Sequence, residues 1–293
     1  MSTLTDAIGY GLVSAILIAL SASAFSLQYS VSGVPNFAHG DLLTIGAYGA
    51  LVAQRMGLNL AAGAAIGGIS GGIFGWLMYR VVLRTFVRRG ARLVFTVAVT
   101  AGIALILENS IGLIFGNSNV NLVVANQVAR HIGPFLWTNT QLVILIGGAV
   151  LLGALYFILL RTDFGRAIRA ISDNPDLARA SGVRVERTVQ MTWLMCGALA
   201  ALAGVALAMS EPNFGIYLGS DFLLVTFAAA IIGGIGKVNG AVIGALIIGV
   251  VTEVSGSYLS AGFKQVCAIT ILVIVLLVRP NGLLNIQRAG AEA

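Results

Sequence analysis

Long apolar windows, joined by short polar or glycine-rich connections, follow one another along almost the whole chain. These windows lie at residues 7–28, 40–56, 59–79, 93–116, 141–160, 189–210, 222–236, 240–260 and 264–278. A helix needs about 20 apolar residues to cross a hydrocarbon core about 30 Å thick. Because glycines at residues 233–240 nearly fuse the seventh window to the eighth, the pattern predicts an all-α, polytopic membrane helix bundle of eight or nine spans.

The composition agrees with a membrane bundle. Of 293 residues, 58% are hydrophobic and 10% are charged, whereas soluble domains carry about a quarter of their residues as charges. A soluble enzyme is therefore excluded, and residues 1–293 are expected to form a single transmembrane domain. Asp6 precedes the first window without any Lys or Arg, so we expect a retained helix there and not a cleaved leader. Cys196 and Cys267 lie in separate windows, so neither a disulfide nor a metal site is expected.

Basic residues gather in three segments of the chain, which carries 17 Lys and Arg against 11 Asp and Glu. Residues 80–92 hold five arginines and no acid, residues 161–187 hold six arginines, and Arg279 and Arg288 follow the last window. The positive-inside rule places such segments in the cytoplasm, which explains the basic excess without nucleic-acid binding. Since an odd number of spans precedes residue 80, the N-terminus is expected outside and the C-terminus in the cytoplasm.

Glycines recur every four residues at Gly63, Gly67, Gly71 and Gly75, and again at Gly236, Gly240 and Gly244. Small residues at this spacing leave a groove along one helix face, which lets two helix backbones approach closely in a membrane. Tight packing inside one bundle is the favoured interpretation, and a subunit interface is the alternative. The tetrapeptide IGGI at residues 66–69 and 232–235 is too short and too common in composition to predict an internal repeat.

The connection between the first two windows combines helix-breaking and polar residues. Pro35 and two glycines interrupt the helix, and Asn36, His39 and Asp41 follow at once. Irregular backbone at membrane depth survives only if it is buried in protein or lines a wet cavity. The segment is therefore either a broken or re-entrant stretch that lines the permeation path, or an ordinary exposed turn with Asp41 at a helix N-terminus.

The segment at residues 161–187 carries the signals of a short capped helix. Asn174 is suited to the cap, Pro175 to the first helical position, and Gly182 to a left-handed end. A helix of about two turns is too short to be stable alone in water. We therefore favour a short cytoplasmic coupling helix held in the groove of a partner; the alternative is a solvated loop whose arginines only set the topology.

Two carboxylates, Glu108 and Glu253, fall inside apolar windows. A carboxylate at the bilayer centre costs about 2.5–3.5 kcal/mol on insertion scales. We favour hydrogen bonding within the bundle, and a proton relay is the alternative. The neighbours expected to bond them are Asn109 and Ser110 for Glu108, and Ser255 and Ser257 for Glu253.

Several short runs together resemble one family of membrane proteins. They are residues 165–170 with Asn174, Ala178 and Gly182, and residues 36–41, 233–236, 239–244 and 279–283. In this order, over nearly the whole chain, they resemble the permeases of ABC importers of the high-affinity branched-chain amino acid type. The match is poorer in the outer loop at residues 117–140.

The resemblance implies a permease that pairs with a homologous second permease subunit, receives substrate from a periplasmic binding protein, and is driven by two cytoplasmic ATPase subunits. It also implies a bacterial inner membrane, no cofactor in this chain, and ATP bound by the partners. A phosphate-binding loop ends in Lys followed by Ser or Thr, whereas Val238 follows Lys237. The chain is thus expected to be a transport subunit and not an enzyme. A homodimer and a heterodimer of permeases both remain open.

The resemblance and the patterns above assign three groups of residues. The translocation path is expected to include Asn36, Phe37, His39, Asp41 and Glu108. The ATPase-coupling group is Gly165, Arg166, Arg169, Asn174, Pro175, Ala178 and Gly182. Glu211 and Asp221, which flank a short outer loop, predict an acidic rim where the binding protein docks.

The favoured function is import of branched-chain or related small amino acids by alternating access. Permeases for urea or short amides are built similarly, so the substrate follows only from the family. A proton-coupled secondary transporter would rely on Glu108, Glu253, His39 and Asp41, and uptake driven by a pH gradient would identify it. A passive channel would use residues 35–40 as a filter, and flux without ATP would identify it.

Overall fold

The computed structural model describes residues 2–124, 128–258 and 261–278, together with Gly282. Arg279 and Arg288, which contributed to the predicted orientation, and most of residues 279–283, which contributed to the resemblance, lie outside the described residues.

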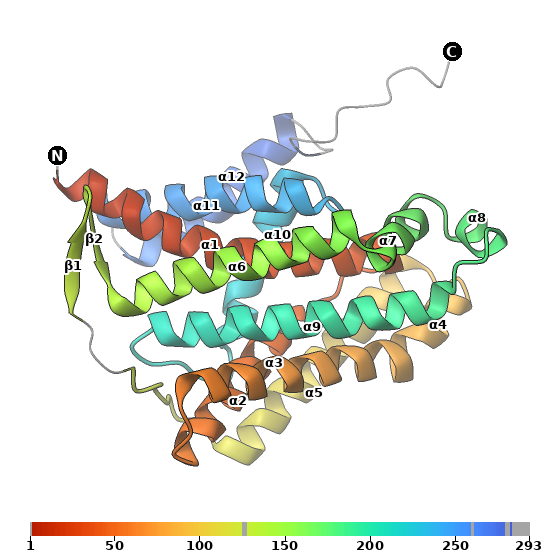
Figure 1. Ribbon diagram of the computed structural model, residues 1–293, viewed down its shortest axis with the longest axis horizontal. Coiled ribbons are helices and arrows are strands. Elements are labelled where there is room, and N and C mark those ends of the chain that lie inside the picture. Colours follow the sequence, from red (N-terminus) through yellow and green to blue (C-terminus); the bar gives the residue numbers. More distant parts are fainter. Residues whose placement is uncertain (1, 125–127, 259–260, 279–281, 283–293) are drawn as a thin grey trace.

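The described chain is a bundle of long helices that run roughly side by side (Figure 1). The longer helices are α1 (Ser2–Ser32), α3 (Leu60–Leu77), α5 (Leu93–Phe115), α6 (Asn139–Arg161), α9 (Val185–Ser210) and α11 (Val238–Tyr258). The shorter ones are α2 (His39–Arg55), the π-helical η1 (Met78–Leu83), α4 (Arg84–Arg88), α7 (Asp163–Asp173), α8 (Pro175–Ala180), α10 (Leu218–Gly233), the 3-10 turn η2 (Ala261–Phe263) and α12 (Lys264–Val278). The all-α membrane bundle is therefore confirmed as the fold class.

The predicted count of eight or nine spans is not confirmed. Among the described residues, 6 helices are long and apolar enough to cross a membrane. The windows at residues 40–56, 222–236 and 264–278 fold as α2, α10 and α12, which have 17, 16 and 15 residues. Each is shorter than the stretch of about 20 residues that a full crossing requires.

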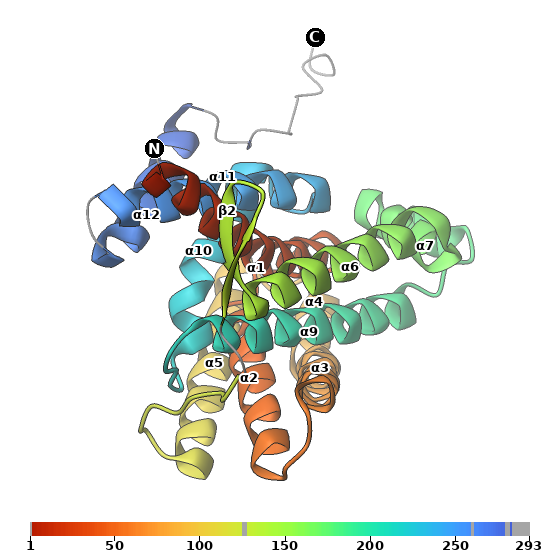
Figure 2. The same ribbon diagram turned by 60° about the vertical axis from the view of Figure 1, so that its left-hand side comes forward.

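A two-stranded antiparallel hairpin lies at the end of the bundle that holds the N-terminus (Figure 2). The sequence pattern predicted only helices and did not predict this hairpin. It joins β1 (Ala129–Ile132) to β2 (Phe135–Thr138). The indole Nε1 of Trp137 donates a hydrogen bond of 3.2 Å to the carbonyl O of Gly9 on α1. We call this the hairpin end of the bundle. Figure 1 shows α7 and α8 at the opposite end, called the α8 end.

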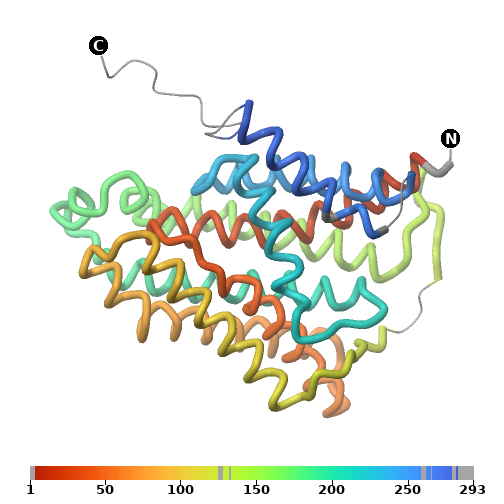
Figure 3. The backbone as a smooth tube through the Cα atoms, turned by 180° about the vertical axis from the view of Figure 1, so that it is seen from behind, coloured from red at the N-terminus to blue at the C-terminus, as the bar shows by residue number. Residues whose placement is uncertain are grey.

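The bundle has two halves that are related as an inverted repeat. α1, α2, α3 and α5 form one half, and α9, α10, α11 and α12 form the other. α1 packs mainly on α11, and α9 mainly on α3, so the long first helix of each half lies against the third helix of the other. α1 begins and α9 ends at the hairpin end, so the two run in opposite directions (Figure 3). Such inverted repeats are typical of membrane transporters.

The same tripeptide stands before two of the shorter helices. The tripeptide Pro-Asn-Phe at residues 35–37 precedes α2, and the same tripeptide at residues 212–214 precedes α10. α2 and α10 cross at Gly40 and Gly219, where a Cβ on either residue would overlap the backbone of the other helix. α2 and α10 are thus in close contact near the residue at which each begins.

The interpretation of the glycine spacing as tight packing within one bundle is confirmed. The glycines of α3 lie against α2 and α9 of the same chain: a Cβ at Gly67 would lie 2.6 Å from the carbonyl O of Gly46, and one at Gly75 would lie 2.8 Å from the carbonyl O of Trp193. Gly240 and Gly244 pack in the same way on α10.

Candidate functional site

The chain folds back into the bundle after α1. His39, the first residue of α2, has its ring Nε2 3.1 Å from the carbonyl O of Ser21 on α1. Ser21 lies 11 residues before Ser32, the end of α1 (32 − 21 = 11), and this separation spans about 16 Å of helix. Residues 33–38 therefore return alongside α1 into the interior. The broken or re-entrant segment predicted here is present.

Five buried polar side chains meet where α2 begins. They are Ser21, Gln28, Asn36, His39 and Thr226, called the His39 cluster. His39 Nδ1 lies 3.1 Å from Gln28 Oε1, and Asn36 Nδ2 donates to the same oxygen at 3.4 Å. The hydroxyls of Ser21 and Thr226 are 2.9 Å apart and join α1 to α10. Buried polar groups that are mutually bonded fix one arrangement of the elements that carry them.

The alternative of an ordinary exposed turn is wrong. Asn36 and His39 are 0% exposed and Asp41 is 1% exposed, although Asp41 does lie in the first turn of α2. Phe37 reaches the surface at 36% exposure, with its ring centroid 5.3 Å from that of Phe227. Glu108 lies half-buried on a different helix, α5. That these five residues line the translocation path stays a prediction.

The predicted hydrogen-bond partners of Glu108 and Glu253 are wrong. Asn109 and Ser110 donate to the carbonyl oxygens of Leu105 and Ile106, one turn earlier on α5. Asn and Ser within helices commonly bond to the carbonyl of the preceding turn, which removes them as partners for Glu108.

Glu253 is held by residues that sequence reasoning missed. Ser14 Oγ on α1 donates to its Oε1 at 2.8 Å, and Lys264 Nζ at the start of α12 donates to its Oε2 at 2.8 Å. Ser257 bonds only the backbone carbonyl O of Glu253, and Ser255 bonds that of Thr252. These partners join three helices at the hairpin end.

The predicted capping signals of the segment at residues 161–187 are confirmed. Asn174 Oδ1 accepts hydrogen bonds of 3.0 Å from the backbone N–H groups of Asp176 and Leu177, Pro175 occupies the first position of α8, and Gly182 ends it at φ 85°. The cap satisfies N–H groups that have no partner within so short a helix.

A second helix, α7, anchors this segment to the bundle. Ile168 and Ile171 on one of its faces are buried, and α7 packs on α6 and α9. Arg169 donates to the carbonyl O of Leu159 near the end of α6. A Cβ at Gly165 would overlap the backbone of α6, so the turn from α6 into α7 requires glycine.

The tip of the segment is α8, which projects from the bundle (Figure 1). Ala178 is buried, whereas Leu177 is 65% exposed. Arg166 and Arg179 are exposed and pair with Asp163 and Asp176 on their own helices. Leu177 therefore presents an exposed apolar side chain on a helix whose orientation is fixed by its cap.

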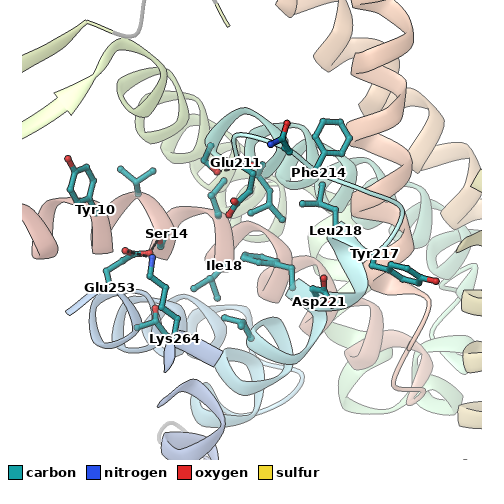
Figure 4. A pocket seen from close by; sticks show the side chains of 18 of the residues that line it. Tyr10, Ser14, Ile18, Glu211, Phe214, Tyr217, Leu218, Asp221, Glu253 and Lys264 are labelled. Atoms are coloured by element: carbon teal, nitrogen blue, oxygen red, sulfur yellow. Dashed lines mark hydrogen bonds and ion pairs between the residues drawn. The ribbon is translucent and has the colours of Figure 1, made fainter. Parts of the chain in front are cut away.

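A cavity of about 740 Å³ opens at the hairpin end, between α1, α9, α10, α11 and the start of α12 (Figure 4). Glu211 and Asp221 both line it, together with Ser14, Glu253 and Lys264. The structure thus brings the two acids of the predicted rim to the same cavity as the Glu253 ion pair. Their contact with a binding protein stays a prediction.

Among the described residues, 6 helices long and apolar enough to cross a membrane, packed into one bundle, define a polytopic membrane protein. The chain belongs to the family described as branched-chain amino acid transport system / permease component, whose family model matches residues 7–278.

Characterised relatives support this assignment. The high-affinity branched-chain amino acid transport system permease protein LivH of Escherichia coli (strain K12) is 32% identical over 281 residues, which cover 91% of each chain. The corresponding permease protein BraD of Pseudomonas aeruginosa is 29% identical over 94% of each chain.

One solved structure shares the fold. PsaBC from Streptococcus pneumoniae in complex with Fab matches 93% of this chain with a TM-score of 0.52 at 15% sequence identity, covering 91% of the matched chain. This likeness concerns the arrangement of helices alone.

Proposed function

We propose that the chain is the membrane permease subunit of an ABC importer that moves branched-chain amino acids inward by alternating access. The observation that carries this proposal is the match to the permease family over residues 7–278. The LivH and BraD relatives, which match along nearly their whole lengths, are named for branched-chain amino acids. The assembly would contain a second, homologous permease subunit, two cytoplasmic ATPase subunits and an external binding protein.

Energy would enter the permease through α7 and α8. A groove on the ATPase subunit receives Leu177 and the exposed face of α8, and movement of that groove displaces the segment. The buried isoleucines of α7 and the bond from Arg169 to Leu159 pass this displacement to α6 and α9. The interrupted segments that precede α2 and α10 then change which side of the bundle is open.

The binding protein would dock at the hairpin end. Glu211 is exposed there and Asp221 is exposed on the first turn of α10, so a docked partner can reach this acidic rim. Charge complementarity of this kind steers association and fixes the orientation of the docked partner.

The orientation follows from the basic residues. Residues 80–92 and 161–187 lie at the α8 end, which we assign to the cytoplasm, and the N-terminus is then outside. With α2, α10 and α12 counted as short crossings beside the six longer helices, the chain has nine membrane segments and a cytoplasmic C-terminus.

Cysteine labelling in intact cells tests this orientation. In a variant whose Cys196 and Cys267 are replaced by alanine, Met56→Cys is expected to react with a membrane-impermeant maleimide, because Met56 is exposed between α2 and α3 on the outer side. Leu177→Cys is expected to react only after the cells are opened. The reverse order of reactivity would show that the orientation is inverted.

Purification from the native membrane tests the proposed assembly. A tagged chain is expected to retain an ATPase that carries a phosphate-binding loop and a second membrane protein of the same family. Mass spectrometry identifies both. Recovery of the tagged chain alone, under mild detergent conditions that preserve other membrane complexes of the same cells, would argue against a shared ATP-driven assembly.

A further inference from the structure

A small cavity at the α8 end is lined by arginines. Arg80, Arg84, Arg88 and Arg89 form its walls together with Thr85, and its volume is about 240 Å³. Arg80 lies on η1, and the others lie on α4 or directly follow it. A guanidinium group carries only hydrogen-bond donors, in a fixed fork that matches the geometry of a phosphate. The cavity therefore suits a phosphate group.

A single carboxylate neutralises only part of this cavity. Glu186, in the first turn of α9, forms ion pairs with Arg84 and Arg88. Four arginines against one glutamate leave a formal charge of +3 (4 − 1 = 3). Arg80 and Arg89 are exposed and form no ion pair among the described residues. An anion can therefore reach two arginines without a counter-charge, beside two that Glu186 holds in place.

The cavity lies at the depth of the lipid headgroups. α3, η1 and α4 follow one another as one apolar helical span of 29 residues, Leu60–Arg88, which is about 43 Å long at about 1.5 Å per residue. About 20 residues suffice to cross a hydrocarbon core about 30 Å thick. Residues 60–79 provide that crossing, so the stretch from Arg80 to Arg88 lies in the headgroup layer on the α8 side.

An apolar face of the same helix leads to the arginines. Ile69, Ile73 and Leu77 are exposed on α3. The guanidinium carbon of Arg80 lies 4.9 Å from the ring centroid of Trp76, and tryptophan is enriched where hydrocarbon meets the headgroups. Ile73, Trp76 and Arg80 follow one another at the spacing of neighbours on one helix face. The surface thus changes from apolar to basic within about two turns, as a phospholipid changes from acyl chain to phosphate.

We propose that this cavity binds the phosphate of an anionic phospholipid in the cytoplasmic leaflet. Arg80 and Arg89 contact the phosphate, Thr85 adds a hydroxyl donor, and the acyl chains lie along the exposed face of α3. Because Glu186 holds two walls of the cavity, the lipid binds where the segment at residues 161–187 joins α9. The leaflet follows from the proposed orientation, whereas the site does not depend on which cargo the permease moves.

An acidic surface of a partner protein is the competing ligand for the same arginines. It would neutralise them, but it would leave the exposed apolar face of α3 without a matching group. A phospholipid satisfies both parts of the surface with one molecule. Clusters of four or more basic residues directly cytoplasmic of a membrane helix are a recurrent arrangement for binding anionic lipids. The observations therefore favour the lipid.

Lipid binding to the purified full-length chain tests the site. The chain in a mild nonionic detergent is titrated with phosphatidylglycerol, or with phosphatidylcholine of the same acyl chains, and native mass spectrometry measures the bound lipid. The wild type is expected to bind phosphatidylglycerol at least tenfold more tightly. Arg80→Gln/Arg89→Gln is expected to lose this preference, since each arginine near an anionic headgroup contributes about fivefold in affinity.

Two further double variants serve as matched controls. Arg161→Gln/Arg184→Gln removes the same charge from exposed positions at the α8 end that do not line the cavity, and is expected to retain the preference. Arg80→Lys/Arg89→Lys keeps the charge and is expected to retain the affinity within about threefold, because lysine also binds phosphate as a point charge. Glycerol phosphate, a headgroup without acyl chains, is expected not to displace phosphatidylglycerol at equal concentration.

Four results would overturn the site. Equal affinity of the wild type for both lipids would leave the arginines as topology signals alone. An equal loss of preference in Arg161→Gln/Arg184→Gln and Arg80→Gln/Arg89→Gln would show an effect of net charge only. Displacement by glycerol phosphate at equal concentration would identify a site for free anions. An unchanged lipid preference in Arg80→Gln/Arg89→Gln, together with loss of the ATPase from the purified complex, would assign these arginines to a protein contact.

Discussion

Replacing Leu177 by aspartate is expected to abolish ATP-driven uptake while leaving the chain folded and inserted. Leu177 is 65% exposed, so a charge there costs the isolated chain little. In the proposed assembly the same side chain fills a groove of the ATPase subunit, where loss of a central apolar anchor costs about 2 kcal/mol or more. That corresponds to about a 30-fold loss of affinity. Uptake into proteoliposomes and ATPase retention on a size-exclusion column measure the two effects.

The control for this variant is Leu177→Met. Methionine retains an apolar side chain of similar volume, and the exchange of Leu for Met at packed contacts usually costs below about 1.5 kcal/mol. We expect uptake close to that of the wild type, and a thermal midpoint unchanged in both variants. If Leu177→Asp transports as well as Leu177→Met, α8 is a solvated element without a partner and the ATPase engages the permease elsewhere.

The second large effect concerns folding. Gly219→Leu is expected to prevent accumulation of folded protein, because a Cβ at Gly219 would overlap the carbonyl O of Gly40 where α2 and α10 cross. Overpacking of a core usually costs about 1–3 kcal/mol. Here the clashing atoms belong to the backbone of a buried helix, so no side-chain rotation can relieve them, and the cost is expected to exceed about 4 kcal/mol.

Gly147→Leu is the matched control for Gly219→Leu. Gly147 is an exposed glycine within α6, and a Cβ added there would meet no atom within 4 Å. Fluorescence-detected size exclusion of detergent extracts is expected to give a normal monodisperse peak for this variant and an aggregated or absent peak for Gly219→Leu. A normal peak for both would mean that the crossing of α2 and α10 is looser than the backbone distances indicate.

The local signals of the sequence predicted much of this architecture. Apolar windows near 20 residues long became the long helices, and the cap at Asn174 and the end at Gly182 lie where residue type alone places them. A break at residues 33–38 is predicted because proline lacks the backbone N–H that continues a helix. Each of these features is determined by residue types within or next to the segment that forms it.

Some features of the structure were not predicted, either because they depend on contacts between distant residues or because a local signal was not used. Ser14 reaches Glu253 across 239 residues of chain, so no local pattern could pair them. The windows at residues 40–56, 222–236 and 264–278 are themselves shorter than about 20 residues, so the short lengths of α2, α10 and α12 were readable from the sequence. Two local signals do predict elements shorter than a membrane span: the amphipathic spacing of Ile168 and Ile171 in α7, and the Gly-Pro turn at residues 133–134 in the hairpin.

Uptake of radiolabelled leucine into proteoliposomes that contain the purified complex tests the central claim most directly. With loaded binding protein on the outer side of the permease and ATP on the α8 side, uptake is expected to require ATP hydrolysis and to persist when the proton gradient is collapsed. Leucine uptake by this chain alone, driven by a pH gradient or proceeding without ATP, would contradict the account.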